Sequence, residues 1–355
     1  MQTKLATIVG SGNYSTLPDI LLMQDFAYEK YVTTYPDLLQ DMTDCGIDFT
    51  QFAEGKLAQS TIDGKNYGVP FDNGTTIAAY RTDILDQAGY TVDDLADIDW
   101  NQFIAIGQDV LAKTGYSLLS VQAGSSDLIY QMMTSAGLST WTDDGEPNLE
   151  GNETLIKCFE IYKEMVDTGV LAVVNSWDEY IATFTSGKTC GVINGCWIMA
   201  SMETADDQSG LWNVTSFPAL PDVATATNYS NQGGSTWAIT QNCKNTDLAV
   251  DFLSKTFAGS VELYETILPS SGALATYLPA GDSDVYTKPQ EFFGGQTVFS
   301  LLTDYAANVP AVNLGVYYTE ANTALATALA NVIAGSDIEA ELATAQKTTL
   351  FDMGR

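Results

Sequence analysis

Short apolar runs alternate with capped, amphipathic segments along most of this chain, and that alternation limits the folds open to it. Strands that alternate with helices are typical of α/β proteins with largely parallel sheets. No repeat with a period of about 20 to 50 residues is visible, which excludes solenoids and propellers. The expected strands cover residues 18–23, 67–71, 75–81, 189–195 and 235–240.

Cap residues and glycines mark the ends of the expected helices. Asn152 begins one helix and Gly169 ends it. Thr246 is expected to cap a second helix, and Ser336 with Glu339 forms the capping box of a third. The expected helices cover residues 152–169, 176–187, 246–259, 319–334 and 336–348.

Two polar segments that contain glycine, "PFDNGTT" (70–76) and "NQGGSTWAIT" (231–240), carry the chain from one apolar run to the next. A third, "KPQEFFGGQT" (288–297), lies farther along. We interpret the three segments as crossings between two domains that share the chain discontinuously. A cleft between two such domains is a preferred place for a ligand.

The charge of the chain excludes several classes of partner. Acidic residues number 45 and basic residues 14, so the net charge is −31. That field repels phosphate backbones and anionic lipid surfaces, and we expect no nucleic-acid partner. No apolar stretch reaches the roughly 18 residues of a membrane span. The five cysteines imply no disulfide framework, and we expect free thiols; a bridge between Cys190 and Cys196, which flank one strand, is the alternative.

The chain contains no histidine, which excludes Ser-His-Asp and Cys-His catalysis and His-containing zinc sites. We interpret the acidic segments 143–145 and 282–284 as turns, because neither has the full ligand set of a calcium loop. We therefore expect no metal, no cofactor and no enzymatic activity. The remaining enzyme hypothesis is a glycoside hydrolase, whose chemistry needs only two carboxylates.

Several segments resemble, in order, those of the sugar-binding, maltose-binding-protein-like type of bacterial extracellular solute-binding protein, the receptor of ABC importers. The segment "KLATIVGSG" followed by "LPDILLMQD" is similar to the family's first helix, turn and strand. The family's two interdomain crossings are matched by two further segments of this chain, "DGKNYGVPFDNGTTIAAYRTDIL" and "GGSTWAITQNCKNTDLAVDFL". The segment "FTSGKTCGVINGCW" is similar to a family strand that ends in Gly-x-Trp.

This resemblance implies a two-domain, periplasmic-binding-protein-like α/β fold with an interdomain cleft. The first domain would comprise residues 1–74 and 238–288, and the second 75–237 and 289–355. In this family a strand, a helix and a second strand precede the "KLAT" helix, and we expect the chain to lack that unit. We expect the full-length form to carry a signal peptide and a lipid-anchor cysteine before it.

The resemblance also implies a function and partners. The protein would capture a mono- or oligosaccharide by closure of its domains and deliver it to ABC transporter permease subunits in the membrane. It would act as a monomer, outside the cell or in the periplasm.

Polar residues at strand ends and crossings are candidate ligand-binding groups. Gln24 and Asp25 follow a strand, where open α/β sheets bind ligands, although capping of the next helix is an alternative role. Asp72 and Asn73 lie in the first crossing, where they would bind a hydroxyl or stabilise a turn. The second crossing offers backbone N–H groups and a hydroxyl, or hinge freedom alone, at Gly233, Gly234 and Ser235.

Aromatic rings complete the expected site, because sugars present apolar C–H faces beside their hydroxyls. Trp197 matches the family's cleft tryptophan and is the main stacking candidate; a core tryptophan is the alternative. Asp127 and Tyr130 match a segment that often lends the cleft an aromatic ring, and Tyr317 is a further candidate. Tyr130 has the alternative role of a core residue.

A solute other than a sugar is the main alternative ligand. A polyamine needs several carboxylates around aromatic rings, and Asp25, Asp72 and Asp127 keep that hypothesis open. A peptide is a further alternative. Stabilisation by one sugar class without turnover would separate these hypotheses from each other and from a hydrolase.

Overall fold

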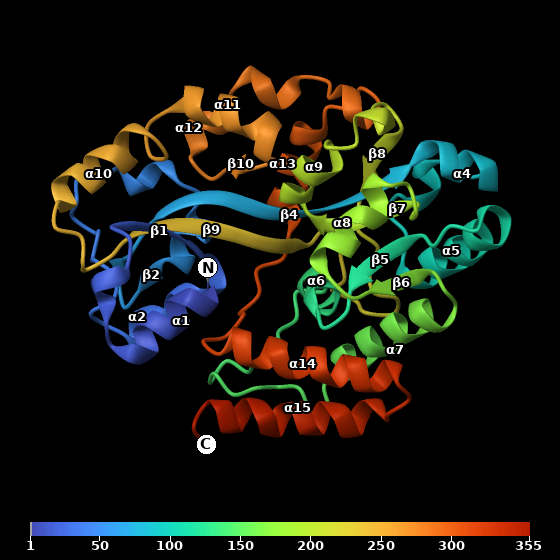
Figure 1. Ribbon diagram of the computed structural model, residues 1–355, viewed down its shortest axis with the longest axis horizontal. Helices are drawn as coiled ribbons and strands as arrows, with labels where there is room; N and C mark the ends of the chain where they lie inside the picture. The colour runs from blue at the N-terminus through green and yellow to red at the C-terminus, as the bar shows by residue number, and fades with distance from the viewer. Residues whose placement is uncertain (1) are drawn as a thin grey trace. The chain divides into compact units, whose positions relative to one another are not determined.

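The computed structural model in Figure 1 describes residues 2–355, and it describes residues 2–4 by their backbone alone. The chain divides into two compact units. The first unit comprises the residues up to 74 with 233–285, and the second comprises 75–232 with 286–355. The chain thus changes unit after residues 74, 232 and 285. The sequence placed the crossings near 72–76, 233–238 and 288–297.

The first expected crossing is one continuous strand, β4 (Val69–Arg81), so the expectation of two strands separated by a loop is wrong. Residues 72–74 are Asp, Asn and Gly, which are poor strand formers. However, residues 72 and 73 pair with β10 (Leu274–Ala275), and this ladder holds them in extended backbone. Cross-strand pairing has overridden the local preference.

In the first unit, strands β1, β9, β4 and β10 form a sheet in that order. β1 (Ile20–Gln24) is antiparallel to β9 (Asn231–Ile239), and Gln24 lies opposite Ser235. Buried side chains of β1, α2 and β9 form one core cluster of this unit. The remaining elements are α1 (Gln2–Ser11), α2 (Tyr28–Thr34), α3 (Glu54–Gln59), β2 (Thr61–Ile62), β3 (Lys65–Asn66), α10 (Thr246–Lys255), α11 (Val261–Ser271) and α12 (Leu278–Gly281).

In the second unit, β4 lies between β7 (Gly191–Gly195) and β8 (Trp212–Thr215) and is antiparallel to both. β5 (Leu119–Gln122) and β6 (Leu171–Val174) pair in parallel, whereas β1–β9, β4–β7, β4–β8 and β4–β10 are antiparallel pairs. The expectation of largely parallel sheets is therefore wrong. Parallel pairing needs a long crossover connection, and helices supply one between β5 and β6. The two strands that pass from one unit to the other have antiparallel partners: β9 pairs in this way with β1, and β4 with β7, β8 and β10.

Helices build most of the core of the second unit. Buried Trp100, Phe103 and Phe159 belong to its main apolar cluster. In Figure 1, α14 and α15 lie side by side, and both contact α7. The helices are α4 (Thr82–Ala88), α5 (Trp100–Thr114), α6 (Asp127–Ser135), α7 (Glu153–Asp167), α8 (Trp177–Thr185), α9 (Met199–Met202), α13 (Val298–Asn308), α14 (Tyr318–Ile333) and α15 (Ile338–Asp352).

Two of the expected caps differ from those in the structure. The expected cap of α7 is confirmed, because the side chain of Asn152 accepts a hydrogen bond from the backbone N–H of Leu155 at 3.0 Å. In α10 the cap residue is Asn245, and Thr246 is the first helical residue. In α15 the cap is Asp337, which accepts from Ala340 N–H at 2.9 Å.

The expected capping box of Ser336 is wrong because that residue belongs to the preceding turn. Its backbone N–H donates to the carbonyl of Asn331, which completes the end of α14. The helix therefore starts one residue later than the Ser-x-x-Glu pattern indicates. An aspartate at the cap also places a negative charge at the positive end of the helix dipole.

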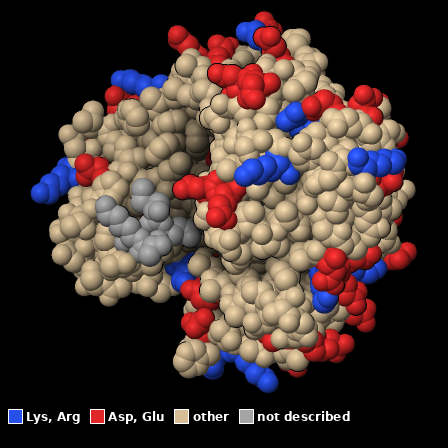
Figure 2. Space-filling model, turned by 45° about the vertical axis from the view of Figure 1, so that its right-hand side comes forward, with Lys and Arg blue, Asp and Glu red and all other residues tan. Residues whose placement is uncertain are grey.

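The charges are dispersed on the face that Figure 2 shows, where acidic side chains form small separate groups with Lys and Arg among them. No helix from residue 2 onward is both long and apolar enough to cross a bilayer. The five cysteines are free thiols, and Cys190 and Cys196, which flank β7, are both buried.

Candidate functional site

A buried ion pair lies where β1 ends in the first unit. Asp25 follows β1 directly and is the first residue of a short 3-10 helix, while Lys56 lies on α3. The ammonium of Lys56 donates to Asp25 Oδ2, and the hydroxyl of Thr236 on β9 donates to Asp25 Oδ1 at 2.7 Å. Both ionic side chains are about nine-tenths buried or more, so the pair is shielded from solvent.

Asp72 lies on β4 near this pair and is 8% exposed. Burial raises its pKa to about 6; Asp25 adds to the rise, whereas Lys56 and a hydrogen bond from Ser235 oppose it. Its Oδ1 atom finds no hydrogen-bond donor among the described residues. We call Asp25, Lys56 and Asp72 the carboxylate–lysine cluster; it holds one cation, two carboxyl groups and one unused buried acceptor.

Gly234 allows β9 to approach this cluster closely. Its φ is +105°, and a Cβ atom there would lie 2.4 Å from Asp25 Oδ2 and 2.7 Å from Lys56 Nζ. Both distances are far shorter than a van der Waals contact. The glycine is therefore required by the space as well as by the backbone angle.

The second unit contains a pocket of about 120 Å³. Residues of β5, β6, β7, α6 and α8 line it, together with Gln232 of β9. We call it the amide–tryptophan pocket. Its polar and aromatic lining includes Ser125, Asp127, Gln131, Trp177, Tyr180, Asn194 and Gln232.

Hydrogen bonds connect the polar side chains of this pocket. Gln232 bonds to the Asp127 carboxylate, whose pKa is raised by burial although the bonds from Ser125 and Gln232 oppose the rise. The amide of Gln131 donates to Gln232 Oε1. Asn194 Nδ2 donates to the hydroxyl of Tyr180 at 3.0 Å, and burial raises the pKa of Tyr180 to about 12. The lining includes no lysine or arginine.

Two tryptophans lie together at the pocket. The rings of Trp177 and Trp197 are 6.0 Å apart, and Trp177 is 42% exposed. The Nε1–H of Trp197 donates to the carbonyl of Gln232 at 3.0 Å. Trp177 belongs to the lining, whereas Trp197 supports it from the side.

Some of the predicted site residues lie at the carboxylate–lysine cluster, some lie at or beside the amide–tryptophan pocket, and the others lie at neither. In the first unit, Asp25, Asp72, Gly234 and Ser235 come together at the carboxylate–lysine cluster. Gln24 is exposed at the end of β1, and Asn73 pairs in β4; Gly233 has a φ of +103° in β9. In the second unit, Asp127 lines the pocket and Trp197 lies beside it.

Two predicted aromatic residues lie elsewhere. Tyr130 is 7% exposed in the core of the second unit, where its ring packs on Tyr318 with centroids 4.6 Å apart. Tyr317 is the cap residue of α14. Neither residue belongs to the pocket lining.

Sequence reasoning missed several residues of both groups. Lys56 gave no signal, because a lysine on a short helix is normally solvated. Trp177 did give one, since a large aromatic residue directly after a Ser cap lies on the exposed first turn of a helix. The others missed are Gln131, Tyr180, Asn194, Gln232 and Thr236.

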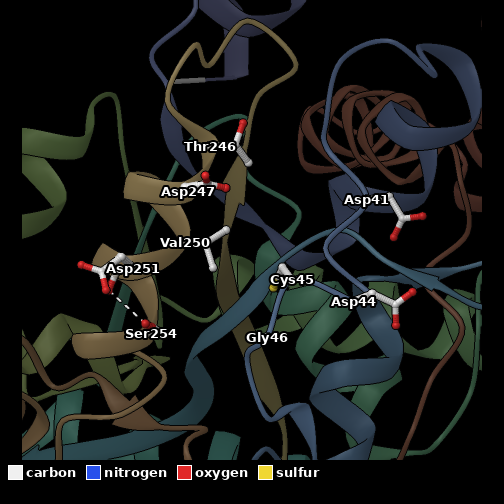
Figure 3. A pocket seen from close by; sticks show the side chains of 9 residues that line it. All are labelled: Asp41, Asp44, Cys45, Gly46, Thr246, Asp247, Val250, Asp251 and Ser254. Carbon is white, nitrogen blue, oxygen red and sulfur yellow. Dashed lines mark hydrogen bonds between the residues drawn. The ribbon is translucent and has the colours of Figure 1, made fainter.

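A larger hollow, of about 690 Å³, lies on the first unit and contains none of the predicted residues (Figure 3). Asp41 and Asp44 line it from one loop, and Asp247 and Asp251 line it from α10. Their carboxylates point in different directions in Figure 3. Within residues 2–355, no group of three or more His, Cys, Asp or Glu residues is placed to hold a metal ion.

The sequence was also compared with known proteins. The profile of the family described as bacterial extracellular solute-binding protein matches residues 1–294. The lactose-binding protein of Rhizobium radiobacter is 37% identical over 339 residues, which cover 96% of this chain and 80% of that protein.

Two solved structures share the fold. One is the ABC transporter-associated binding protein of B. animalis subsp. lactis in complex with β-1,6-galactobiose. Its TM-score is 0.85 and its sequence is 20% identical, and the match covers 99% of this chain and 88% of that one. Another is the galacto-N-biose-/lacto-N-biose I-binding protein of Bifidobacterium longum. Its TM-score is 0.80 and its sequence is 22% identical, and the match covers 100% of this chain and 86% of that one. The chain is a member of the bacterial extracellular solute-binding protein family.

Proposed function

We propose that the protein is the substrate-binding component of an ABC importer and binds a neutral mono- or oligosaccharide for delivery to the permease. The observation that carries this proposal is the 37% identity to a lactose-binding protein over 96% of the chain. Lactose is therefore the first ligand to test. We further propose a monomeric protein with a lipid anchor in its full-length form.

The chemistry of both groups supports a neutral, hydroxyl-rich ligand. The carboxylate–lysine cluster offers a buried acceptor at Asp72 Oδ1 and already neutralises its own cation, Lys56. The amide–tryptophan pocket offers amides, a carboxylate and an exposed indole ring. Polar planar groups for hydroxyls and an aromatic ring for a C–H face are what a sugar needs.

The proposed ligand-binding residues are those of the two groups together with the remaining predicted positions. Closure of two domains over the ligand stays a prediction. Such closure would be a population shift, in which the ligand favours the form that makes additional contacts with it. The full set of proposed positions predicted from sequence is Gln24, Asp25, Asp72, Asn73, Asp127, Tyr130, Trp197, Gly233, Gly234, Ser235 and Tyr317.

Calorimetric titration and thermal shift with a ligand panel test the proposal. The panel contains lactose, β-1,6-galactobiose, maltose, galactose, spermidine and a short peptide. A ligand at 100 times its dissociation constant stabilises the native state by about 2.7 kcal/mol, which a melting curve detects. We expect a shift with a sugar and no hydrolysis of it by chromatography. A shift with spermidine or the peptide alone, or turnover of a sugar, would contradict the proposal.

A further inference from the structure

The hydrogen bonds of the amide–tryptophan pocket fix which way its amides point. An ionised carboxylate only accepts hydrogen bonds, so Gln232 donates to Asp127 with its amide nitrogen. Its Oε1 then faces Gln131 and accepts from Gln131 Nε2. Gln131 is left with its Oε1 atom as the free end of this series. Asp127 thus sets the orientation of Gln131 through Gln232.

The free end is an acceptor that the protein itself does not satisfy. Gln131 is 2% exposed and lines the pocket, and its Oε1 finds no donor among the described residues. A buried acceptor without a donor is unfavourable, and a ligand that supplies the donor removes that cost. A sugar hydroxyl is such a donor. An acidic group on the ligand would meet Asp127 and the acceptor, with no lysine or arginine in the lining to neutralise it.

Trp177 supplies the apolar wall. It is the first residue of α8, and its large ring is 42% exposed at a pocket of about 120 Å³, which has room for about one sugar ring. Trp197 lies outside the lining, with its ring held by the hydrogen bond to Gln232.

We propose that Trp177 and Gln131 set the specificity of this pocket for one neutral sugar ring, which stacks on Trp177 and donates a hydroxyl hydrogen bond to Gln131 Oε1. Asp127 is a positioning residue that acts through Gln232. This inference rests on the proposed function, and it adds which class of sugar is accepted: rings with an unmodified hydroxyl, and not uronic acids.

A double-mutant cycle between protein and ligand tests the contact. Lactose and its monodeoxy analogues are titrated into the wild type and Gln131→Met, which keeps the length of the side chain and removes the acceptor. One analogue should bind the wild type about tenfold more weakly than lactose, and Gln131→Met should bind both equally. Asp127→Asn should lose the same discrimination, because Gln232 is then free to turn. If Gln131 and Asp127 had only a structural role, their substitution would weaken the binding of lactose and of its analogues equally.

The contribution of the Trp177 ring to affinity and the effect of a negative charge on the ligand need separate measurements. Trp177→Ala should weaken lactose binding about thirtyfold, whereas Phe351→Ala, which removes a ring that is 77% exposed on α15, should leave it unchanged. A disaccharide with galacturonic acid in place of galactose should bind the wild type at least about a hundredfold more weakly than lactose. Melting curves of each variant show that it is folded.

The outcomes separate this inference from the proposed function. If lactose binds but Gln131→Met discriminates among the analogues as the wild type does, the inference fails and the function stands. Tight binding of the uronic acid also overturns it. If another sugar of the panel binds in place of lactose, the cycle is run with that sugar and its deoxy analogues. Binding of spermidine and of no sugar overturns both proposals.

Discussion

The buried polar side chains of the two units differ in how far the protein itself satisfies their hydrogen bonds. The carboxylate–lysine cluster of the first unit contains an internal ion pair, so most of its hydrogen-bonding capacity is used by the protein itself. The amide–tryptophan pocket of the second unit has no cation in its lining, and a series of uncharged amides ends in an unused acceptor. The first arrangement holds strands and a helix together; the second leaves more of its polar surface for a ligand.

This difference indicates that substitutions in the two groups should have different readouts. Breaking the ion pair leaves buried charge, which destabilises the fold. Removing a ring or an amide from the pocket leaves the core intact and should act on ligand affinity. The predictions below test that division.

The largest effect is expected from Lys56→Met. Loss of the ammonium leaves Asp25 buried without a counter-charge and should lower the free energy of unfolding by about 3 to 5 kcal/mol. Urea unfolding followed by tryptophan fluorescence measures it. The matched control is Lys255→Met, which removes one partner of an exposed ion pair with Asp251 and should change stability by under about 1 kcal/mol. Equal effects of the two variants would contradict the role given to the cluster.

Gly234→Ala should destabilise the first unit by about 2 kcal/mol more than Gly335→Ala does. The two glycines have nearly the same φ, +105° and +106°, but a Cβ atom at Gly335 meets nothing within 4 Å. The difference therefore measures the clash with Asp25 and Lys56 alone. Melting temperatures of both variants provide the test, and matching values would show that the cluster yields to the extra methyl group.

Asp72→Asn should change the pH dependence of stability. Because the folded pKa of Asp72, about 6, lies above its ordinary 3.8, the folded state holds the proton more tightly than the unfolded state. This contribution is fully present below about pH 4 and is lost as the pH rises through about 6. The variant should therefore gain roughly 2 kcal/mol relative to the wild type between pH 4 and pH 7.5.

Unfolding curves at these two pH values measure that gain, and Asp44→Asn, at an exposed position of the same unit, is the control. An identical pH profile for wild type and Asp72→Asn would show that this carboxyl group is better solvated than its position indicates.

The smallest effect is expected from Trp197→Ala. Its ring supports Trp177 and donates to the Gln232 carbonyl, so its loss should weaken sugar binding about fivefold, roughly 1 kcal/mol. Titration with the same sugar as for Trp177→Ala gives the comparison. A larger loss than that of Trp177→Ala would reverse the roles of the two rings.

The sequence predicted the α/β class, the family and the five helices α7, α8, α10, α14 and α15, because caps and apolar stripes act over one or two turns of the chain. Asn152 caps α7 as expected, and Ser176, the first residue of the helix expected over 176–187, caps α8. Strand direction was not predictable in this way. It depends on which distant strands pair with β4 and β9, and the local pattern of an apolar run is the same in parallel and antiparallel pairs.

For the candidate site, the sequence by itself determined the chemical inventory: no histidine, a large excess of carboxylates, and tryptophans directly after a cap and a strand. Only the tertiary structure decided how that inventory is used. Lys56 meets Asp25 across 31 positions of the chain, and Gln131 meets Gln232 across 101. Such contacts are made by packing between distant elements, and that packing removes water from groups that local sequence would leave solvated.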